Sequence, residues 1–481
     1  MMRSLRIISA GCILLLSGSV GAEAASRPNI LFLFTDDQPS GYIQALDASG
    51  IRTPNIDRLV ATGTSFTNAY IMGASSPGVC LPSRAMLLSG RTLWNIENQG
   101  QWGYEISEAH KTLPEVFRGA GYATFATGKN DPGKAGQFGR AYTHGDKLLF
   151  QGMSRQYGMP LHEFRPDGDY SRSKPQKDGS GRQSAEVYAD ATIRFIEFRA
   201  GNDQPFYAYV AFQTPHDPRD APRQYHDMYR PDDMPLPPSF LPRHPFDNGM
   251  LDIRDEKTAP MPRTEAAIRR HIADFRAMMT HTDAQIGRIL TALEKAGKSD
   301  NTIVVFASDN GLALGNHGLM GKQNIHEHSI KVPLILSGPG IPRGEIRTQL
   351  CYLPDIHPTL HQLAGLTSPD TVEFQSLAPV LTEKSATHRE HLYIAFMSWQ
   401  RGIRKGGHKL IEYRVNGTRH TQLFDLLQDP HETENLAEKP EHQATLASLR
   451  ALLEKERLRL NDGNTPHAFA NQQGIDFWSA P

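Results

Sequence analysis

Cysteine is scarce in this chain, since its 481 residues include only three. Cys12 lies in an apolar N-terminal run, so we expect only Cys80 and Cys351 in the folded protein. Two cysteines allow a single disulfide, which excludes a small fold held together by several bridges. If Cys80 has another role, we expect Cys351 to be a free, buried thiol that packs as a small apolar residue.

An excess of charge of one sign is also lacking, because 51 basic residues balance 52 acidic ones and leave a formal net charge of −1. This balance gives no support for binding to nucleic acid or to an anionic membrane surface. Low-complexity tracts and internal repeats are absent as well. The length of the chain favours about two to three globular domains.

Long hydrophobic runs are limited to one, at residues 7–20. Arg3 and Arg6 precede it, and residues 22–24 offer an Ala-Glu-Ala cleavage site, as in a secretory signal peptide. The run contains Ser and Gly and is short for a membrane span. We therefore expect residues 1–24 to be removed. The mature protein is expected to be periplasmic or secreted, without a membrane span.

Apolar strand-like runs alternate with helical patterns through residues 25–375, the predicted catalytic domain. Strands are expected at 29–34, 122–127, 206–212, 302–307 and 332–337. Helices are expected at 56–62, 85–88, 112–118, 185–198 and 266–296. This alternation predicts an α/β fold with a largely parallel sheet covered on both faces.

The pattern changes in residues 376–481, the predicted C-terminal subdomain. Short antiparallel strands are expected at 391–397, 409–413 and 422–426, followed by an amphipathic helix at 443–458. These elements predict a smaller α+β unit. Two regions rich in Pro and Gly, 140–181 and 218–262, are expected to be long loops that shape a substrate pocket.

Polar residues follow the ends of several predicted strands: Asp36, Asp37, Lys129, His216, Asp309 and Asn310. In a parallel sheet these ends meet at one edge, where ligands bind. Asp36, Asp37, Asp309 and Asn310 offer hard oxygen ligands, which suit Ca²⁺ or Mg²⁺ better than zinc. Either pair alone is typical of a turn or cap. Together they predict a cation site, because each pair ends a separate strand.

The run from Cys80 to Arg91 has the pattern C-x-P-S-R-x-x-x-L-x-G-R. A cysteine in isolation is usually a buried thiol, but this pattern resembles the maturation motif of formylglycine-dependent (type I) sulfatases. In that family a maturation enzyme oxidises the cysteine to an aldehyde, formylglycine. The resemblance implies the same change at Cys80.

The resemblance covers nearly all of the chain after residue 24, with segments in the family's order at 28–37, 128–129, 214–216, 304–311, 321–333, 401–411 and 423–436. It implies an alkaline-phosphatase-like α/β fold with a mixed, mostly parallel sheet. It also implies one Ca²⁺ held by Asp36, Asp37, Asp309 and Asn310. The groups around formylglycine and sulfate would be Arg84, Lys129, His216 and Lys322.

The chemistry implied by this resemblance explains the residue types. Hydration of the aldehyde gives two hydroxyl groups: one attacks sulfur and expels the alcohol, and the other lets the sulfated enzyme collapse and release sulfate. Lysine and arginine stabilise the negative charge that develops on the ester. His216 would bind sulfate or protonate the leaving alcohol.

One position departs from the family pattern, because Asn130 and Asp131 stand where Trp and His usually follow Gly-Lys. The family histidine takes a proton during release of sulfate. Asp131 is therefore a candidate base, a contact for a cationic part of the substrate, or a mark of reduced activity. His110 and His144 are further candidates for the missing imidazole.

The leading hypothesis is an exported sulfatase that hydrolyses an O-sulfate ester. A sulfated carbohydrate is the expected substrate class, by analogy with exported bacterial relatives. A phosphodiesterase or phosphonate monoester hydrolase of the same fold is the alternative enzyme. The third hypothesis is a protein that binds sulfated glycans without turnover.

Overall fold

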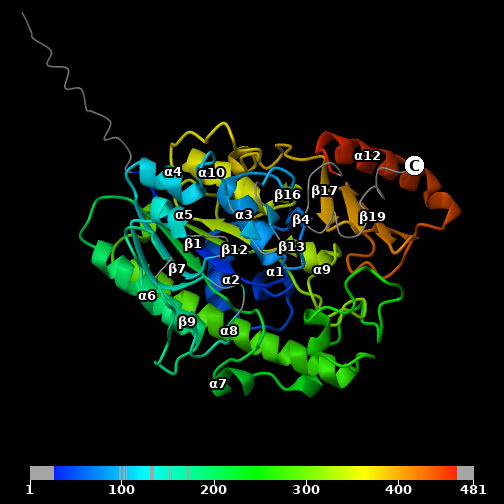
Figure 1. Cartoon of the computed structure of the whole chain (residues 1–481), viewed down its shortest axis with the longest axis horizontal. Coiled ribbons are helices and arrows are strands. Elements are labelled where there is room, and N and C mark those ends of the chain that lie inside the picture. The colour runs from blue at the N-terminus through cyan, green and yellow to red at the C-terminus, as the bar shows by residue number, and fades with distance from the viewer. Residues whose placement is uncertain are drawn as a thin grey trace, which may run out of the picture.

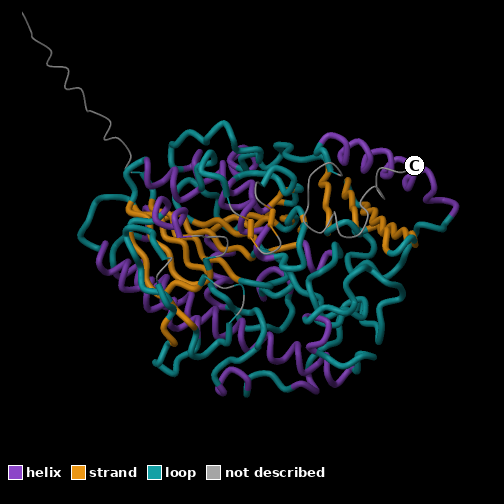
Figure 2. Tube along the Cα trace, viewed as in Figure 1, coloured by secondary structure: helices purple, strands orange, loops and turns teal. Residues whose placement is uncertain are grey.

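The computed structural model describes residues 27–462, apart from short segments at 97–98, 101–102, 105, 131–134, 151, 153 and 171–172. The predicted signal peptide and Asp131 therefore lie outside the described residues. Helices cover one large sheet, and a smaller sheet lies beside it (Figures 1 and 2).

The large sheet has eight strands in the order β15 (Glu345–Arg347), β2 (Gly63–Phe66), β14 (Leu334–Ser337), β12 (Thr302–Ser308), β1 (Asn29–Thr35), β11 (Phe206–Ala211), β7 (Ala123–Lys129) and β8 (His144–Leu149). The five strands from β12 to β8 are parallel to their neighbours, whereas β14 is antiparallel to both β12 and β2. The predicted mixed, mostly parallel sheet is confirmed.

Both faces of this sheet are covered, since every residue of β1 is buried. Phe32 and Phe34 pack into one apolar cluster with residues of α3 (Cys80–Ser89), α4 (Leu113–Gly119) and α10 (Ile356–Leu363). Leu31 and Leu33 pack on the other face with α2 (Pro54–Thr62), α6 (Ser184–Arg199) and α8 (Glu265–Lys295). In Figure 1, α6 and α8 lie below the sheet and α3, α4 and α10 above it. Because helices cover both faces of the sheet, side chains on both sides of β1 are buried, which explains its continuous apolar sequence.

The smaller sheet is built from β20 (Thr418–Asp425), β19 (His408–Val415), β18 (Gln400–Lys405), β17 (His391–Phe396) and β4 (Gly73–Ala74). The first four are antiparallel to one another, and α12 (Gln443–Arg459) packs against them. Figure 1 shows this unit at the right. Because β4 pairs with β17, the N-terminal half supplies a strand to the C-terminal sheet.

Shorter elements complete the described fold. The helices are α1 (Gln44–Asp47), α5 (Ala135–Ala141), α7 (Arg223–His226), α9 (Glu327–Ile330) and α11 (Ala378–Thr382), and the strands are β3 (Ala69–Tyr70), β5 (Gln99–Gly100), β6 (Gly103–Tyr104), β9 (Pro160–Leu161), β10 (Gln176–Lys177), β13 (Lys331–Val332) and β16 (Cys351–Tyr352). Five 3₁₀ turns lie at η1 (Pro231–Asp233), η2 (Asp255–Thr258), η3 (Ser299–Asn301), η4 (Leu353–Asp355) and η5 (Pro440–His442).

Three sequence-based expectations need correction. The region 140–181 was expected to be a loop but contains β8, whose polar first residues sit half-buried at the sheet edge. The strand expected at 332–337 is divided at Pro333, which has no N–H to donate, into β13 and β14. The helix expected to follow Cys80 in fact begins at Cys80.

The two cysteines among the described residues, Cys80 and Cys351, are both buried and not joined by a disulfide. The expectation of a buried, free Cys351 is confirmed. Over the described part of the chain, no helix combines the length and the apolar character that crossing a membrane requires.

Candidate active site

The site is built where parallel strands end. Asp36 and Asp37 directly follow β1, and Asp309 and Asn310 directly follow β12. Thr35 lies opposite Ser308 in the parallel register, so the two polar pairs leave the sheet side by side. Each of the four residues is at most 1% exposed. Burial of three carboxylates at one place requires compensating positive charge.

The backbone holds the first pair in a fixed direction. The N–H of Asp36 donates to the carbonyl of Thr214 at 3.0 Å, and the N–H of Asp37 donates to Asp309 Oδ1 at 3.1 Å. Asp37 has a φ of 66°, a left-handed conformation that is uncommon outside glycine. Such conformations cluster at functional sites, where the surroundings enforce them.

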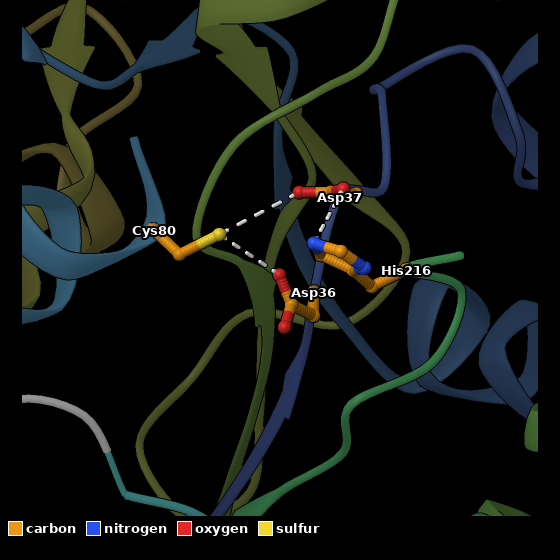
Figure 3. A group of neighbouring side chains, drawn as sticks. All are labelled: Asp36, Asp37, Cys80 and His216. Carbon is orange, nitrogen blue, oxygen red and sulfur yellow. Dashed lines mark hydrogen bonds and ion pairs between the residues drawn. The ribbon is translucent and has the colours of Figure 1, made fainter. Parts of the chain in front are cut away.

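Cys80 is the first residue of α3, and its Sγ lies among the carboxylates. The thiol donates to Asp36 Oδ1 at 3.2 Å, and Asp37 Oδ1 is 3.7 Å away (Figure 3). Burial, reinforced by the charge of Asp36, raises the pKa of the Cys80 thiol well above its usual range. Because a cysteine nucleophile acts as thiolate, these surroundings disfavour an unmodified Cys80 as the attacking group.

Basic side chains pair with the carboxylates. Lys129 Nζ forms an ion pair with Asp36, and Lys322 Nζ lies 2.5 Å from Asp37 Oδ1 and 2.8 Å from Cys80 Sγ. Arg84 Nε donates to Asp309 Oδ2 at 2.8 Å. Burial is the largest influence and opposes ionisation of Asp36, but Lys129, together with His216 and Arg84, outweighs it, so the pKa of Asp36 is lowered. Three cations are thus matched to three carboxylates.

His216 follows β11 and completes the group drawn in Figure 3. Its Nδ1 donates to the backbone carbonyl of Asp217 at 2.8 Å. This bond directs Nε2 towards Asp37 Oδ2, which lies 3.6 Å away. The imidazole therefore faces the same space as the Cys80 thiol, where it can exchange a proton with a bound group.

The site also fits a hard cation. Asn310 Nδ2 donates to Asp37 Oδ1 at 2.8 Å, but Asn310 Oδ1 is buried and receives no hydrogen bond from any residue that the structure describes. A buried carbonyl oxygen without a partner is costly. An oxygen-binding cation would satisfy it together with the neighbouring carboxylates, and Ca²⁺ and Mg²⁺ prefer such ligands.

Comparison with known proteins identifies the family. The sulfatase family profile matches residues 28–366, and a profile described as N-sulphoglucosamine sulphohydrolase, C-terminal, matches residues 315–459. The chain belongs to the sulfatase family. As a member of this family, the protein is an enzyme that hydrolyses sulfate esters.

Relatives of this sulfatase match it over most of their length. An arylsulfatase from Clostridium perfringens is 28% identical over 477 residues, which cover 91% of this chain and 96% of the relative. An ulvan-active sulfatase from Formosa agariphila is 28% identical over 460 residues, covering 92% and 83%.

Two solved structures illustrate the likeness of fold. One, described in complex with its substrate D-glucosamine-2-N,6-O-disulfate, has a TM-score of 0.74 at 24% identity, covering 91% of this chain and 99% of the other. The other, a phosphonate monoester hydrolase from Agrobacterium radiobacter, has a TM-score of 0.70 at 21% identity, covering 90% and 96%. The alkaline-phosphatase-like fold expected from the sequence is confirmed.

All the predicted site residues of this sulfatase except Asp131 converge at one edge of the sheet: Asp36, Asp37, Cys80, Arg84, Lys129, His216, Asp309, Asn310 and Lys322. Asp131 lies outside the described residues. Among the other imidazoles considered, His144 opens β8 and its ring contacts Phe195 and Phe198 of α6. Because β8 runs parallel to β7, His144 starts near the opposite edge of the sheet.

Sequence reasoning missed the neighbours that hold these residues. Ser83 is part of the cysteine motif but was given no role from the sequence. In the structure its Oγ donates to the Asp309 carbonyl at 2.5 Å. In the region expected to be a loop, Glu256 accepts from the two residues before Lys322 and Asp255 accepts from Gln323, which follows it. Adjacent acidic residues in a long irregular region gave no pattern that could have identified them.

A second cluster of metal-binding residue types lies outside this site. Atoms of His317, His326 and Glu432 lie within 4.8 Å of one another. The two imidazole rings are stacked, however, with centroids 4.1 Å apart and planes 16° apart. Imidazole lone pairs lie in the ring plane, so stacked rings cannot direct both lone pairs at one ion. The arrangement favours a packed histidine cluster.

Proposed function

We propose that this protein is an exported sulfatase that removes an O-sulfate group from a sulfated carbohydrate, with formylglycine at position 80 and one Ca²⁺ at the site. The observation that carries the proposal is the position of Cys80. Its Sγ is within hydrogen-bonding distance of Asp36 and of Lys322, at the N-terminus of a helix whose sequence has the maturation motif. Because Cys80 is buried in the folded chain, the partner that modifies it, a maturation enzyme, would act before the chain folds.

The side chains that would hold the cation are Asp36, Asp37, Asp309 and Asn310. When bound, Ca²⁺ supplies positive charge that lowers the pKa of a coordinated hydroxyl and polarises the ester. Formylglycine, once formed, supplies a hydrated aldehyde as the nucleophile. Both contributions depend on the side-chain oxygen atoms of the residues that follow β1 and β12.

The basic residues bind and orient the sulfate group in this proposal. Lys322 Nζ lies 2.8 Å from Cys80 Sγ, so we expect it to donate a hydrogen bond to the formylglycine that replaces this cysteine. Lys129 presents its charge from the end of β7. Arg84, which has 0% exposed surface, holds Asp309 in place rather than reaching for the substrate.

His216 is proposed as the proton donor for the leaving alcohol. Its Nδ1 hydrogen bond to a backbone carbonyl fixes the ring, which leaves Nε2 free to carry or release a proton. The remaining candidate, Asp131, is proposed only as a group that takes a proton or contacts the substrate. Its role rests on the sequence.

A sulfated carbohydrate is the substrate class that the relatives favour. The ulvan-active sulfatase and the structure bound to a disulfated glucosamine both point to sulfated sugars. Similar folds carry different activities, so this step is an argument by likeness. Periplasmic or secreted location is proposed from the N-terminal sequence and suits a polymeric substrate.

Activity measured on matched substrates tests this proposal. The protein, produced together with a formylglycine-generating enzyme, is assayed with an aryl sulfate, an aryl phosphate and an aryl phosphonate, and then with defined sulfated saccharides. Release of sulfate from a saccharide at the highest kcat/KM supports it. Preferential phosphonate hydrolysis would support the alternative enzyme, and saccharide binding without release of sulfate would support the binding protein.

A further inference from the structure

Lys322 lies on a long irregular connection between β12 and α9. Its ammonium group must nevertheless stay within hydrogen-bonding distance of position 80. A long side chain on an irregular segment has many conformations, and fixing one of them carries an entropic cost. Lys322 is 3% exposed, so the surrounding protein holds this segment in place.

Glu256 binds the segment from one side. Its Oε2 accepts the N–H of Met320 at 2.9 Å, and its Oε1 accepts the N–H of Gly321 at 2.8 Å. Arg263 forms an ion pair with the same carboxylate. Glu256 is 6% exposed, so its buried carboxylate is bound by Arg263 and by the N–H groups of the two residues that precede Lys322.

Gln323 binds the segment from the other side. Its Oε1 accepts the N–H of Lys322 at 3.0 Å, and its Nε2 donates to Asp255 Oδ2 at 2.7 Å. The same Nε2 donates to the carbonyl of Pro77 at 3.1 Å, three residues before Cys80. Gln323 therefore connects the Lys322 segment to the segment that leads into Cys80.

Gly321 packs so closely against Asp255 and Gln323 that a residue larger than glycine would not fit at this position. A Cβ atom there would lie 2.3 Å from Gln323 Oε1 and 2.9 Å from Asp255 Cβ. The segment is thus pressed directly against the Asp255–Glu256 pair. A displacement of either partner would be passed to Lys322 through one or two peptide bonds.

We propose that Glu256 is a positioning residue for Lys322, acting through the peptide groups of Met320 and Gly321 and without contact with the substrate. The inference rests on the role proposed above for Lys322. A misplacement of about 1 Å in a catalytic group can reduce the rate by about a hundredfold. Glu256→Gln keeps the shape of the side chain but loses its charge and one of its acceptor oxygens.

A double-mutant cycle on the formylglycine-containing enzyme tests this proposal, with Glu256→Gln, Lys322→Ala and the double variant. Rates are divided by the formylglycine fraction measured by peptide mass spectrometry. We expect Glu256→Gln to reduce kcat about tenfold to a hundredfold, with a smaller change in KM. In the Lys322→Ala background, the same substitution should cause no further loss, because Glu256 then has nothing to position.

Asp252→Asn is the matched control, because Asp252 lies on the segment that leads to Glu256 and its side chain is 96% exposed. It should leave kcat unchanged. An equal loss from Glu256→Gln in both backgrounds would overturn the inference, because it would show an effect independent of Lys322. Full activity of Lys322→Ala would instead refute the proposed role of Lys322.

Gln323→Met provides the same test if Glu256→Gln does not fold. Methionine has a similar length but none of the three hydrogen bonds of Gln323. The expected result is again a loss of kcat that disappears in the Lys322→Ala background. A normal kcat for Gln323→Met, with Lys322→Ala impaired, would show that the segment needs no such support.

Discussion

Individual residues decide what this site can do. The amide oxygen of Asn310 is buried without a donor among the described residues, beside carboxylates that already have basic partners. Cys80 is held as a thiol by burial and by Asp36. Both observations are consistent with the proposed cation beside Asn310 and with the proposed modification at position 80.

Cys80→Ala is expected to abolish sulfate release while the protein stays folded, because the change removes one small buried atom. Mass spectrometry of wild-type peptides should show the aldehyde at position 80 when the maturation enzyme is present. Cys351→Ala is the matched control, since Cys351 is also buried but lies in β16. Full activity in protein whose Cys80 is entirely thiol would refute the formylglycine mechanism.

Asp309→Ala is expected to lose both the cation and activity, because one carboxylate oxygen ligand disappears and Arg84 loses one of its partners. Elemental analysis should find one Ca²⁺ per wild-type chain and little in the variant. Asp300→Ala, on the exposed turn before β12, should keep both. Stoichiometric zinc in active enzyme, or activity without any metal, would contradict the proposed site.

The sequence predicted that Asp36, Asp37, Asp309 and Asn310 would lie close together, because each pair directly follows an apolar strand and the two strands are parallel neighbours. The partners of those residues could not be predicted in this way. Glu256 contacts Met320 and Gly321 across more than sixty positions, through backbone N–H groups that carry no sequence pattern. Contacts of this kind depend on how an irregular loop folds, which local propensity does not specify.

At the scale of elements, the apolar strands β1 and β12 were predicted, whereas β8 at the edge of the large sheet and β18 inside the small sheet were not. β1 and β12 are buried along their whole length, so their sequences are continuously apolar. β8 and β18 contain charged residues because part of each strand faces solvent or an ion pair. Arg401 in β18, for example, pairs with Asp462. Polar strands of this kind resemble loops in sequence.

The connection between β16 and α10 depends on one buried carboxylate. Asp355 is 0% exposed, accepts from Arg389 Nε and His388 Nε2 at 3.0 Å each, and also accepts the N–H of Tyr352 at 2.8 Å. Burial is the largest influence and opposes its ionisation, but Arg389 and His388 together outweigh it, so the pKa of Asp355 is lowered. Its charge therefore stabilises the folded state.

Asp355 should consequently make the stability of the protein decrease in acid. Because its folded pKa lies below the unfolded value of about 3.9, its contribution is full above that pH and is lost as the pH falls towards the folded pKa. Asp355→Ala is expected to lower the free energy of unfolding at pH 7 by about 3 kcal/mol or more. It should also flatten the decline in stability below pH 4. Denaturant titrations across pH measure both effects.

Exposed Asp370→Asn is the control for that experiment, and its stability should follow the wild type. An Asp355→Ala variant whose unfolding free energy falls by the same amount at pH 3 and pH 7 would contradict the argument. In that case packing, and not the charge of Asp355, would account for the loss.

At the scale of the whole molecule, the two sheets share one apolar core. Leu392 and Ile394 of β17 belong to the same buried cluster as Leu87 of α3 and Leu360 of α10. The pairing of β4 with β17 adds backbone hydrogen bonds between the two halves of the chain. The boundary predicted at residue 375 therefore separates two patterns of secondary structure, while the hydrophobic core continues across it.

A chain that ends at residue 375 is accordingly expected not to fold to a soluble, active enzyme. The truncation would expose the apolar faces that β17 and α12 cover, and it would leave the edge of β4 unpaired. Near-UV circular dichroism, cooperative thermal unfolding and sulfate release should all be lost. A chain that ends at residue 462 keeps every described element and is the control. If the 25–375 fragment is monomeric, unfolds cooperatively and hydrolyses an aryl sulfate, the C-terminal unit is an independent appendage and the shared core is dispensable.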